Sequence, residues 1–205
     1  MIIKESQVNT IIIDKSEFIT YLKPVFSVEE ALDFLSDIRK KHYDATHNCY
    51  AYAIGDNMEI QKCSDDGEPS KTAGAPILDV LKKQNVTNII CIVTRYFGGI
   101  KLGAGGLVRA YSSSCSEALK KCIFQEKKDY LKINVSIPYD LIGNIERFLR
   151  SNTELINTDF SNVVSYDVYI LDSYYSEFEK EITNISKGLG IIKILEKEFR
   201  YSDII

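Results

Sequence analysis

Alternating and periodic hydrophobic positions divide the first half of the chain into strands and helices. The strand segments are short and rich in β-branched or aromatic residues, whereas the helix segments repeat apolar residues every three to four positions. Ser27 and Glu30 form the capping-box pattern that precedes a helix. The pattern therefore predicts strands at 8–13, 17–26, 47–54, 58–63 and 86–93, helices that follow Ser27 and begin at Thr72 or Ala73, and an exposed polar loop at 64–71.

The pattern changes after five polar residues, 125–129, which we interpret as a linker between two domains, 1–124 and 130–205. Beyond the linker the order is strand, helix, strand, strand, helix, strand, and this order suggests a ferredoxin-like βαββαβ domain. RNA-recognition modules share that fold, but Tyr166 and Tyr169 would lie on opposite strand faces and could not form one base-stacking platform. The predicted segments are strands at 130–137, 155–160, 163–171 and 191–199 and helices at 141–149 and 178–185.

Residues 94–111, called the glycine junction below, connect a buried strand to a helix expected over 107–122. They hold five of the chain's 11 glycines, flanked by three cationic side chains. Glycine lets backbone N–H groups approach a ligand, and the start of a helix carries partial positive charge. The junction therefore predicts an anion-binding surface, although the glycines could instead serve only a tight turn and close packing. The candidate residues are Lys71, Thr72, Arg95, Gly98, Gly99, Lys101, Gly103, Gly105, Gly106 and Arg109.

Two acids in the polar loop, Asp66 and Glu68, suggest an alternative to simple binding. If they faced the glycine junction across a cleft, the protein could be an enzyme acting on a small phosphate-bearing ligand. A closed pocket of roughly 300–1,000 Å³ would favour that alternative, and an open basic groove would favour nucleic acid. The junction carries neither a Walker loop nor a dinucleotide fingerprint.

The remaining reactive side chains provide no enzyme or metal signature. His47 and Cys49 share a strand face, but no third group is identifiable that would orient a nucleophile pair. The spacing of histidines and cysteines fits no standard zinc site, so we expect no metal, no cofactor and no assigned catalytic residue. Five cysteines without a C-x-x-C pair are typical of reduced core thiols.

Charge and hydropathy narrow the range of partners. Residues 1–124 hold 15 basic and 15 acidic side chains, and residues 125–205 hold 10 and 14, which argues against a wholly basic nucleic-acid binder but permits a local basic patch. No signal-peptide pattern follows Met1, and no apolar run reaches the roughly 18 residues of a membrane span. We therefore expect a cytoplasmic protein that does not enter a membrane.

Three segments closely resemble the Impact/YigZ family (uncharacterised protein family 29). The family core R-[FYW]-[FYW]-G-G-x-x-[LIVM]-G is matched from Arg95 to Gly103, and His47–Tyr52 looks like its H-x-C-x-A segment. The polar loop and the start of the helix predicted after it, within residues 66–78, also resemble segments of this family. The resemblance implies an α+β protein with an N-terminal domain like domain 2 of ribosomal protein S5. It also implies a ferredoxin-like C-terminal domain akin to the last domain of elongation factor G.

The resemblance also implies a function in or near translation. Eukaryotic members bind the activator of an initiation-factor kinase through an additional N-terminal RWD domain, which we do not expect here because the chain begins at its first strand. For bacterial-type members it implies contact with nucleic acid or the ribosome. We therefore expect a non-enzymatic binding protein for RNA or the ribosome, the alternatives being a small-ligand enzyme and an adaptor for a translation factor. The sequence assigns no oligomeric state.

Overall fold

A computed structural model describes residues 1–204 and divides them into two compact units. The N-terminal unit comprises Met1–Glu126 together with Asp203 and Ile204, and the C-terminal unit comprises Lys127–Ser202. Both units mix helices and strands, so the chain has the predicted α+β class. None of the helices in this part of the chain is long and apolar enough to cross a membrane.

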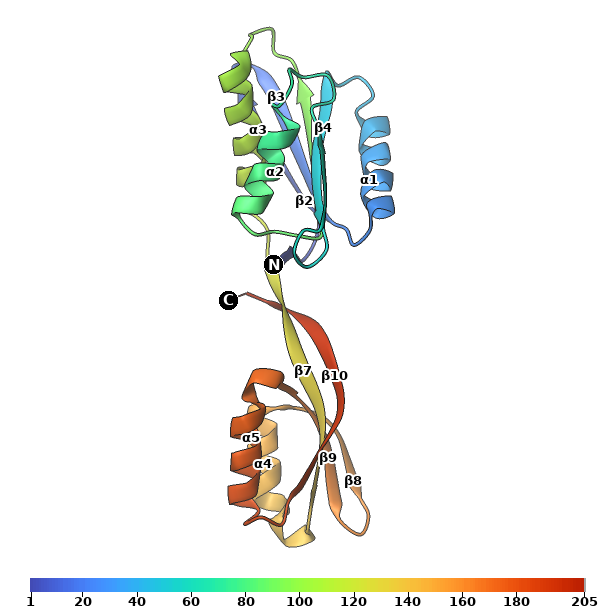
Figure 1. Cartoon of the computed structure of the whole chain (residues 1–205), viewed down its shortest axis with the longest axis vertical. Helices are drawn as coiled ribbons and strands as arrows, with labels where there is room; N and C mark the ends of the chain where they lie inside the picture. Colours follow the sequence, from blue (N-terminus) through green and yellow to red (C-terminus); the bar gives the residue numbers. More distant parts are fainter. Residues whose placement is uncertain (205) are drawn as a thin grey trace. The chain divides into compact units, whose positions relative to one another are not determined.

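The N-terminal unit contains a five-stranded antiparallel sheet with the order β2-β3-β6-β4-β5. A further short strand, β1, pairs with the first residues of β7 (Phe124–Ile137). The elements of this unit, shown in Figure 1, are β1 (Ile2–Ile3), β2 (Gln7–Ile13), β3 (Ser16–Pro24), α1 (Val28–Lys41), β4 (His47–Ile54), β5 (Ile60–Ser64), α2 (Gly74–Lys83), β6 (Ile89–Tyr96) and α3 (Gly103–Leu119).

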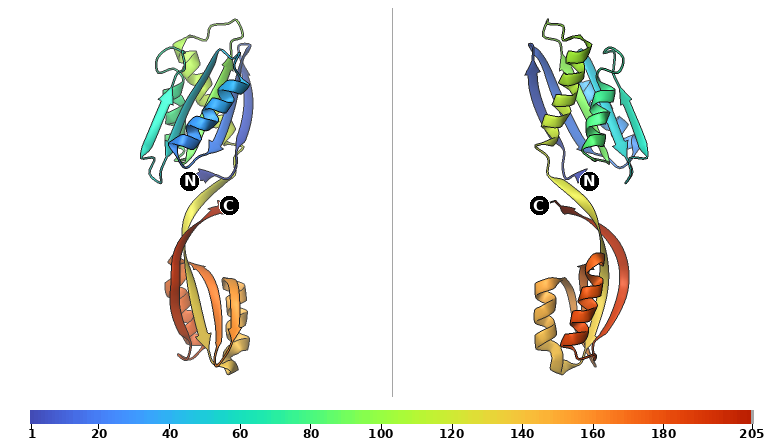
Figure 2. Two further views of the ribbon diagram at one scale, coloured as in Figure 1. Left: turned by 90° about the vertical axis from the view of Figure 1, so that its right-hand side faces the viewer. Right: turned by 60° about the vertical axis from the view of Figure 1, so that its left-hand side comes forward.

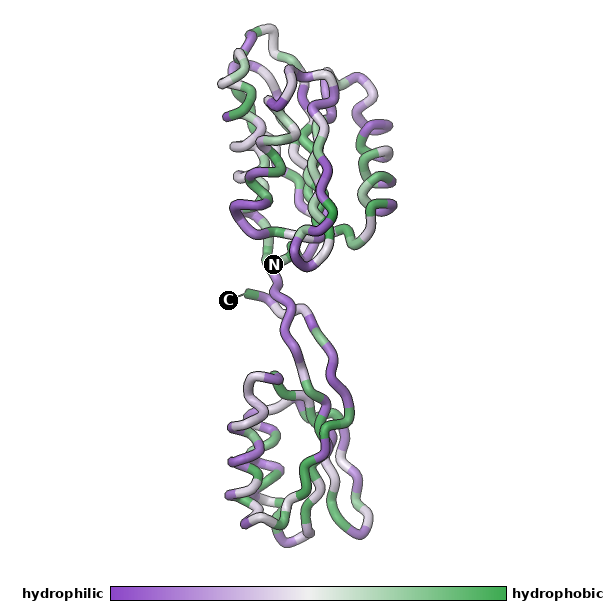
Figure 3. Tube along the Cα trace, viewed as in Figure 1, coloured by the Kyte–Doolittle hydropathy of each residue, from purple (hydrophilic) through white to green (hydrophobic). Residues whose placement is uncertain are grey.

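Helices cover both faces of this sheet, which explains why its central strands are continuously hydrophobic. Figure 2 shows α1 crossing one face and α2 and α3 lying on the other. In β6, Cys91 and Val93 pack with α2 and α3, whereas Ile90 and Ile92 pack with α1. The outer side of α1 is hydrophilic, as expected for a helix that buries one face (Figure 3).

Local chemistry explains the predicted turn and helix start. Asp14 and Lys15 both have positive φ, the conformation of the tight turns that match the twist of a hairpin. Ser27 Oγ accepts a hydrogen bond from the Glu30 backbone N–H at 3.1 Å, and this caps α1. The hairpin between β2 and β3 and the cap of α1 are therefore confirmed.

The C-terminal unit is the expected ferredoxin-like domain. Its four strands have the order β10-β7-β9-β8, and its core residues alternate along the strands. Tyr166 is fully buried while Tyr169 is not, which confirms that they occupy opposite faces of β9. After β7, the elements are α4 (Ile142–Asn152), β8 (Glu154–Phe160), β9 (Val164–Leu171), α5 (Tyr175–Ile185) and β10 (Ile191–Asp203), with short 3₁₀ turns at Tyr139–Leu141 and Asp172–Tyr174.

Three sequence-based expectations need correction. The predicted linker, residues 125–129, is part of strand β7, and the division between the two units falls within it, between Glu126 and Lys127. The helix predicted over 107–122 begins at Gly103 and ends at Leu119, so Gly103, Gly105 and Gly106 lie in its first turn. The loop at 64–71 is not uniformly exposed, because Glu68 is buried against the sheet.

Candidate functional site

Strand pairing places the side chains of Phe18, Arg95 and His47 in one row across the sheet. Arg95 in β6 is in register with His47 in β4 on one side and with Phe18 in β3 on the other. Arg95 follows Cys91 and Val93 at two-residue spacing, so it lies on the sheet face that α2 and α3 cover. Because β6 continues to Tyr96, Arg95 belongs to the strand rather than to the turn after it.

A buried ion pair lies beneath the glycine junction. Arg95 Nη1 donates to Glu68 Oε1 at 2.6 Å, and both side chains are at least 94% buried. Tyr111 of α3 donates its hydroxyl to the same carboxylate oxygen at 2.8 Å. Burial, together with the neighbouring Cys49 and Glu68, raises the pKa of Tyr111 far above its ordinary value, so the phenol stays protonated as a donor. The polar loop, β6 and α3 are therefore linked through one carboxylate.

Asp65 and Asp66 of the polar loop are used to build the loop itself. The Asp65 carboxylate accepts from the backbone N–H groups of Lys71, Ala73 and Gly74. Gly74 is the first residue of α2 and Ala73 is its N-cap, whose own side chain forms no capping hydrogen bond. Burial raises the pKa of Asp65, but these three hydrogen bonds outweigh it and hold the pKa below its ordinary value.

The Asp66 carboxylate is held from two directions. It accepts from the Arg39 guanidinium at 2.5 Å and from the Asn48 backbone N–H at 2.7 Å. Thr72, another predicted ligand contact, is buried and donates its hydroxyl to the Pro69 carbonyl at 2.6 Å. Both residues therefore stabilise the loop rather than offer free groups to a ligand.

His47 and Cys49 do not form a nucleophile pair. His47 Nδ1 lies 2.8 Å from the Asp66 carbonyl oxygen, and the Cys49 thiol donates to the Asp65 carbonyl at 2.9 Å. Burial raises the pKa of Cys49 to about 12, which keeps the sulfur in its unreactive thiol form. Within residues 1–204, no group of three or more His, Cys, Asp or Glu side chains is placed to hold a metal ion.

A pocket of about 300 Å³ opens between the polar loop and the glycine junction. Glu68 and Arg95 form part of its lining, together with His47, and Phe97 and Lys101 approach from the segment between β6 and α3. The other lining residues are Thr46, Pro69, Leu102, Gly103, Ala104 and Leu107.

The start of α3 borders this pocket with open backbone. Its N-cap residue, Leu102, provides no side-chain hydrogen bond, so the first N–H groups of the helix lack that partner. A Cβ added at Gly103 or Gly105 would meet no atom within 4 Å. A Cβ at Gly98, in contrast, would overlap the Lys15 backbone, so Gly98 serves close packing against the β2–β3 turn.

The predicted site residues thus divide into two groups. Glu68, Arg95, Lys101 and Gly103 meet at the pocket, whereas Asp66, Lys71, Thr72, Gly98, Gly99, Gly105, Gly106 and Arg109 do not line it. The expectation that Arg95 offers a free charge was wrong, because the strand buries it against Glu68. Lys101 and Arg109 are exposed and make no ion pair within residues 1–204.

Sequence reasoning did not place His47 or Phe97 at this site. Strand register brings His47 beside Arg95, and this pairing depends on contacts 48 residues apart that no local pattern encodes. Phe97 is 48% exposed, with the Arg95 guanidinium carbon 5.4 Å from its ring centre. The sequence did offer a signal for Phe97, because it is an aromatic residue directly after a strand and before the glycine pair Gly98 and Gly99.

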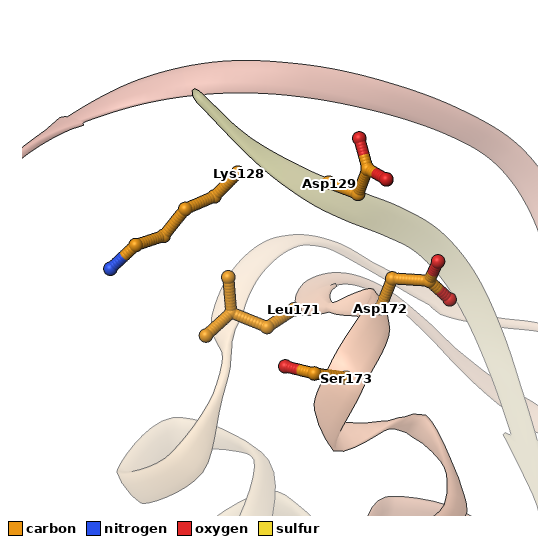
Figure 4. A pocket seen from close by; sticks show the side chains of 5 residues that line it. All are labelled: Lys128, Asp129, Leu171, Asp172 and Ser173. Atoms are coloured by element: carbon orange, nitrogen blue, oxygen red, sulfur yellow. The ribbon is translucent and has the colours of Figure 1, made fainter. Parts of the chain in front are cut away.

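A larger hollow of about 580 Å³ lies within the C-terminal unit and contains none of the predicted site residues. Asp129 and Asp172 line it, and Lys197 forms ion pairs with both, at 3.7 and 2.5 Å. Figure 4 shows the Lys128 side chain extending away from the two carboxylates. Because its acids are already paired, we place the candidate site at the glycine junction instead.

Comparison with known proteins identifies both halves of the chain. Residues 14–119 match the Impact N-terminal domain, and residues 135–189 match a domain of unknown function, DUF1949. The chain is 44% identical to IMPACT family member YvyE of Bacillus subtilis, over 97% of this chain and 91% of that protein. It is 36% identical to IMPACT family member YigZ of Escherichia coli, over 86% of this chain and 88% of that protein.

A solved structure shares the two-domain fold. The crystal structure of a hypothetical protein covers 95% of this chain, and this chain covers 96% of it, with 34% sequence identity and a TM-score of 0.60. The similarity between that structure and this chain extends over both domains. Because residues 14–119 match the Impact N-terminal domain and the chain is 44% identical to a family member over 97% of its length, the chain belongs to the IMPACT family.

Proposed function

We propose that this protein is a non-enzymatic RNA-binding protein that acts in translation or its regulation. The observation that carries the proposal is the uncapped start of α3, where exposed backbone N–H groups lie next to the exposed Lys101. Helix N-termini and lysines are both used to bind phosphate oxygens.

Further features of the same face support RNA over an isolated anion. Phe97 and Ile100 are 48% and 43% exposed beside the cationic groups, and base stacking on an exposed aromatic ring is a common way to hold single-stranded RNA. Arg109 lies about 1.7 helical turns beyond Gly103, the first residue of α3, and is exposed, so it can contact a neighbouring phosphate of an extended ligand.

The buried Glu68–Arg95 pair changes how this surface must be tested. Replacing Arg95 would break a buried ion pair, so lost binding in such a variant would report unfolding rather than lost phosphate contact. The informative variant is Lys101→Ala with Arg109→Ala, because both side chains are exposed and unpaired within residues 1–204. Lys83→Ala, an exposed lysine at the C-terminal end of α2, is the matched control.

The test measures binding of a fluorescent structured ribosomal RNA fragment by anisotropy between 50 and 250 mM KCl. We expect wild type and Lys83→Ala to bind with the same steep salt dependence, and the double variant to bind weakly with a shallower slope. Absence of RNA binding at the lowest salt, or an unchanged slope in the double variant, would overturn the proposal. Pull-down with and without nuclease separates RNA binding from a protein adaptor.

A second candidate function is binding or conversion of a small phosphate-bearing ligand. The specific observation in its favour is the pocket of about 300 Å³ that contains Glu68, which is at the lower end of the range for small-ligand sites. Asp66 does not reach the pocket, so the two-acid arrangement predicted for catalysis is not formed. Isothermal titration with nucleoside monophosphates, followed by product analysis, separates this candidate from RNA binding.

A further inference from the structure

The hydrogen bond from His47 fixes which ring nitrogen carries a proton. A carbonyl oxygen only accepts, so Nδ1 donates to the Asp66 carbonyl at 2.8 Å. In the neutral ring, Nε2 is therefore a free acceptor. It lies 3.8 Å from Glu68 Oε2, which is beyond hydrogen-bond distance. Two acceptors thus face each other at the pocket wall.

Glu68 is an incompletely satisfied carboxylate. Its Oε1 atom accepts from both Arg95 and Tyr111, whereas its Oε2 atom makes no hydrogen bond with the residues that the structure describes. The side chain is only 3% exposed, yet Glu68 lines the pocket. A carboxylate in a nearly buried side chain is costly unless donors reach it, and here the pocket is the route by which a donor can reach Oε2.

We propose that this pocket binds the ribose of the 3′-terminal nucleotide of an RNA, where the 2′- and 3′-hydroxyls are both free, with Glu68 Oε2 accepting the proton of one hydroxyl and His47 Nε2 contacting the neighbouring hydroxyl. The inference rests on the proposed RNA-binding function and specifies which part of RNA the pocket reads. Carboxylates commonly recognise ribose through the 2′-hydroxyl in nucleotide sites, and the 2′-hydroxyl is what distinguishes RNA from DNA.

A hydroxyl fits this pair better than other donors. One hydroxyl of the ribose can donate to Glu68, and its neighbour can either donate to a neutral His47 ring or accept from a protonated one, so the pair of hydroxyls satisfies the site in both states. An ammonium group would meet the positive charges of Arg95 and Lys101, which line the same pocket.

The rest of the pocket suits the other parts of a nucleotide. Lys101 and the first backbone N–H groups of α3, near Gly103, can hold the phosphate. Phe97, Leu102 and Leu107 provide an apolar wall against which a sugar or base can pack. The small volume, about 300 Å³, accommodates one such unit at a time.

The test compares three fluorescent oligonucleotides of one sequence: RNA, 2′-O-methyl RNA and DNA. The 2′-O-methyl strand keeps the sugar conformation of RNA but removes the donor, so it separates hydroxyl recognition from backbone shape. We expect wild-type protein to bind RNA at least tenfold more tightly than either of the other strands at the same salt concentration.

Variants assign the discrimination to the pocket. In His47→Ala, RNA binding should fall to within about threefold of DNA binding while DNA affinity is unchanged. Lys101→Ala should weaken all three strands by a similar factor, and Lys83→Ala should change none. Glu68→Gln is an additional variant, to be read only if its melting temperature shows that it folds, since Glu68 pairs with Arg95.

The outcomes separate this inference from the function on which it rests. Equal binding of all three strands by wild type would overturn hydroxyl recognition but leave RNA binding standing. Discrimination that His47→Ala leaves intact would likewise overturn it. If none of the strands binds at low salt, the proposed function itself fails.

Discussion

Arg95 Nη1 lies 2.6 Å from Glu68 Oε1, and both side chains are buried between the sheet and α3. This contact joins a strand residue to a loop residue 27 positions earlier, and Tyr111 closes the group from α3. The loop that carries Glu68 is thereby fixed against the glycine junction. The shape of the candidate site depends on this pair.

Breaking the ion pair from one side should be more costly than removing both charges. Arg95→Met leaves an unpaired buried carboxylate and should destabilise the protein by about 3–5 kcal/mol. The double variant Arg95→Met with Glu68→Gln should lose less than the sum of the two single changes, because no uncompensated charge remains. Urea unfolding at pH 7 measures all three, and additive losses would contradict the coupling.

Two glycines of the junction should respond oppositely to alanine. Gly98→Ala would drive a Cβ into the Lys15 backbone and should cost about 1–3 kcal/mol or more. Gly105→Ala meets nothing within 4 Å and should be neutral or stabilise by up to about 1 kcal/mol. Thermal and urea unfolding of both variants tests the contrast. Equal losses would show that the close approach at Gly98 is not tight.

Part of the free energy of unfolding should depend on pH in the acid range, because the Asp65 carboxylate must be ionised to cap α2. Its carboxyl pKa is lowered in the folded state, so its contribution is complete above the ordinary value of 3.8 and disappears as the pH falls through the lower, folded-state pKa. Asp65→Ala should cost about 1–2 kcal/mol at pH 7, as loss of a helix cap does.

The same variant should approach wild type in strongly acidic solution, where both proteins lack the charged carboxylate. Urea unfolding at pH 7 and pH 2 provides the comparison. Asp37→Ala removes an exposed carboxylate paired with Lys40 at 3.5 Å and should change stability by less than about 0.5 kcal/mol. A deficit of Asp65→Ala that persists undiminished at pH 2 would rule out the charged cap.

Each phosphate contact should appear in the salt dependence of RNA binding. Lys101→Ala and Arg109→Ala should each reduce the slope of log affinity against log salt concentration by about 0.7–0.9. The reduction should be the same for RNAs of different sequence, because phosphate contacts carry no base information. Anisotropy titrations at four salt concentrations measure the slopes, with Lys83→Ala as the reference.

Cys49 should be inert in the folded protein. With a pKa of about 12, its thiolate fraction at pH 8 is on the order of 10⁻⁴, and the sulfur is buried. Ellman's reagent should leave Cys49 unmodified in native buffer and modify all five cysteines in guanidinium. Comparing wild type with Cys49→Ala identifies the site, and rapid modification of Cys49 would revive a nucleophilic role.

Local patterns were sufficient for most elements because their signals lie close together in the chain. The cap formed by Ser27 and Glu30, the turn at Asp14 and Lys15, and the alternation along β9 each depend on neighbours within a few residues. The bounds at the glycine junction were less well predicted. Glycines in the first turn of α3 have low helix propensity, and packing of Leu107 and Tyr111 compensates for it.

The sequence by itself determined the α+β class, the ferredoxin-like order of the C-terminal segments, and the family to which the glycine-junction motif belongs. Tertiary structure alone decided that Arg95 is paired inside the protein while Lys101 stays exposed. The physical reason is that a charge is free or neutralised according to what lies across the sheet from it. Glu68 reaches Arg95 only when the loop folds over β6, and no spacing along the chain encodes that contact.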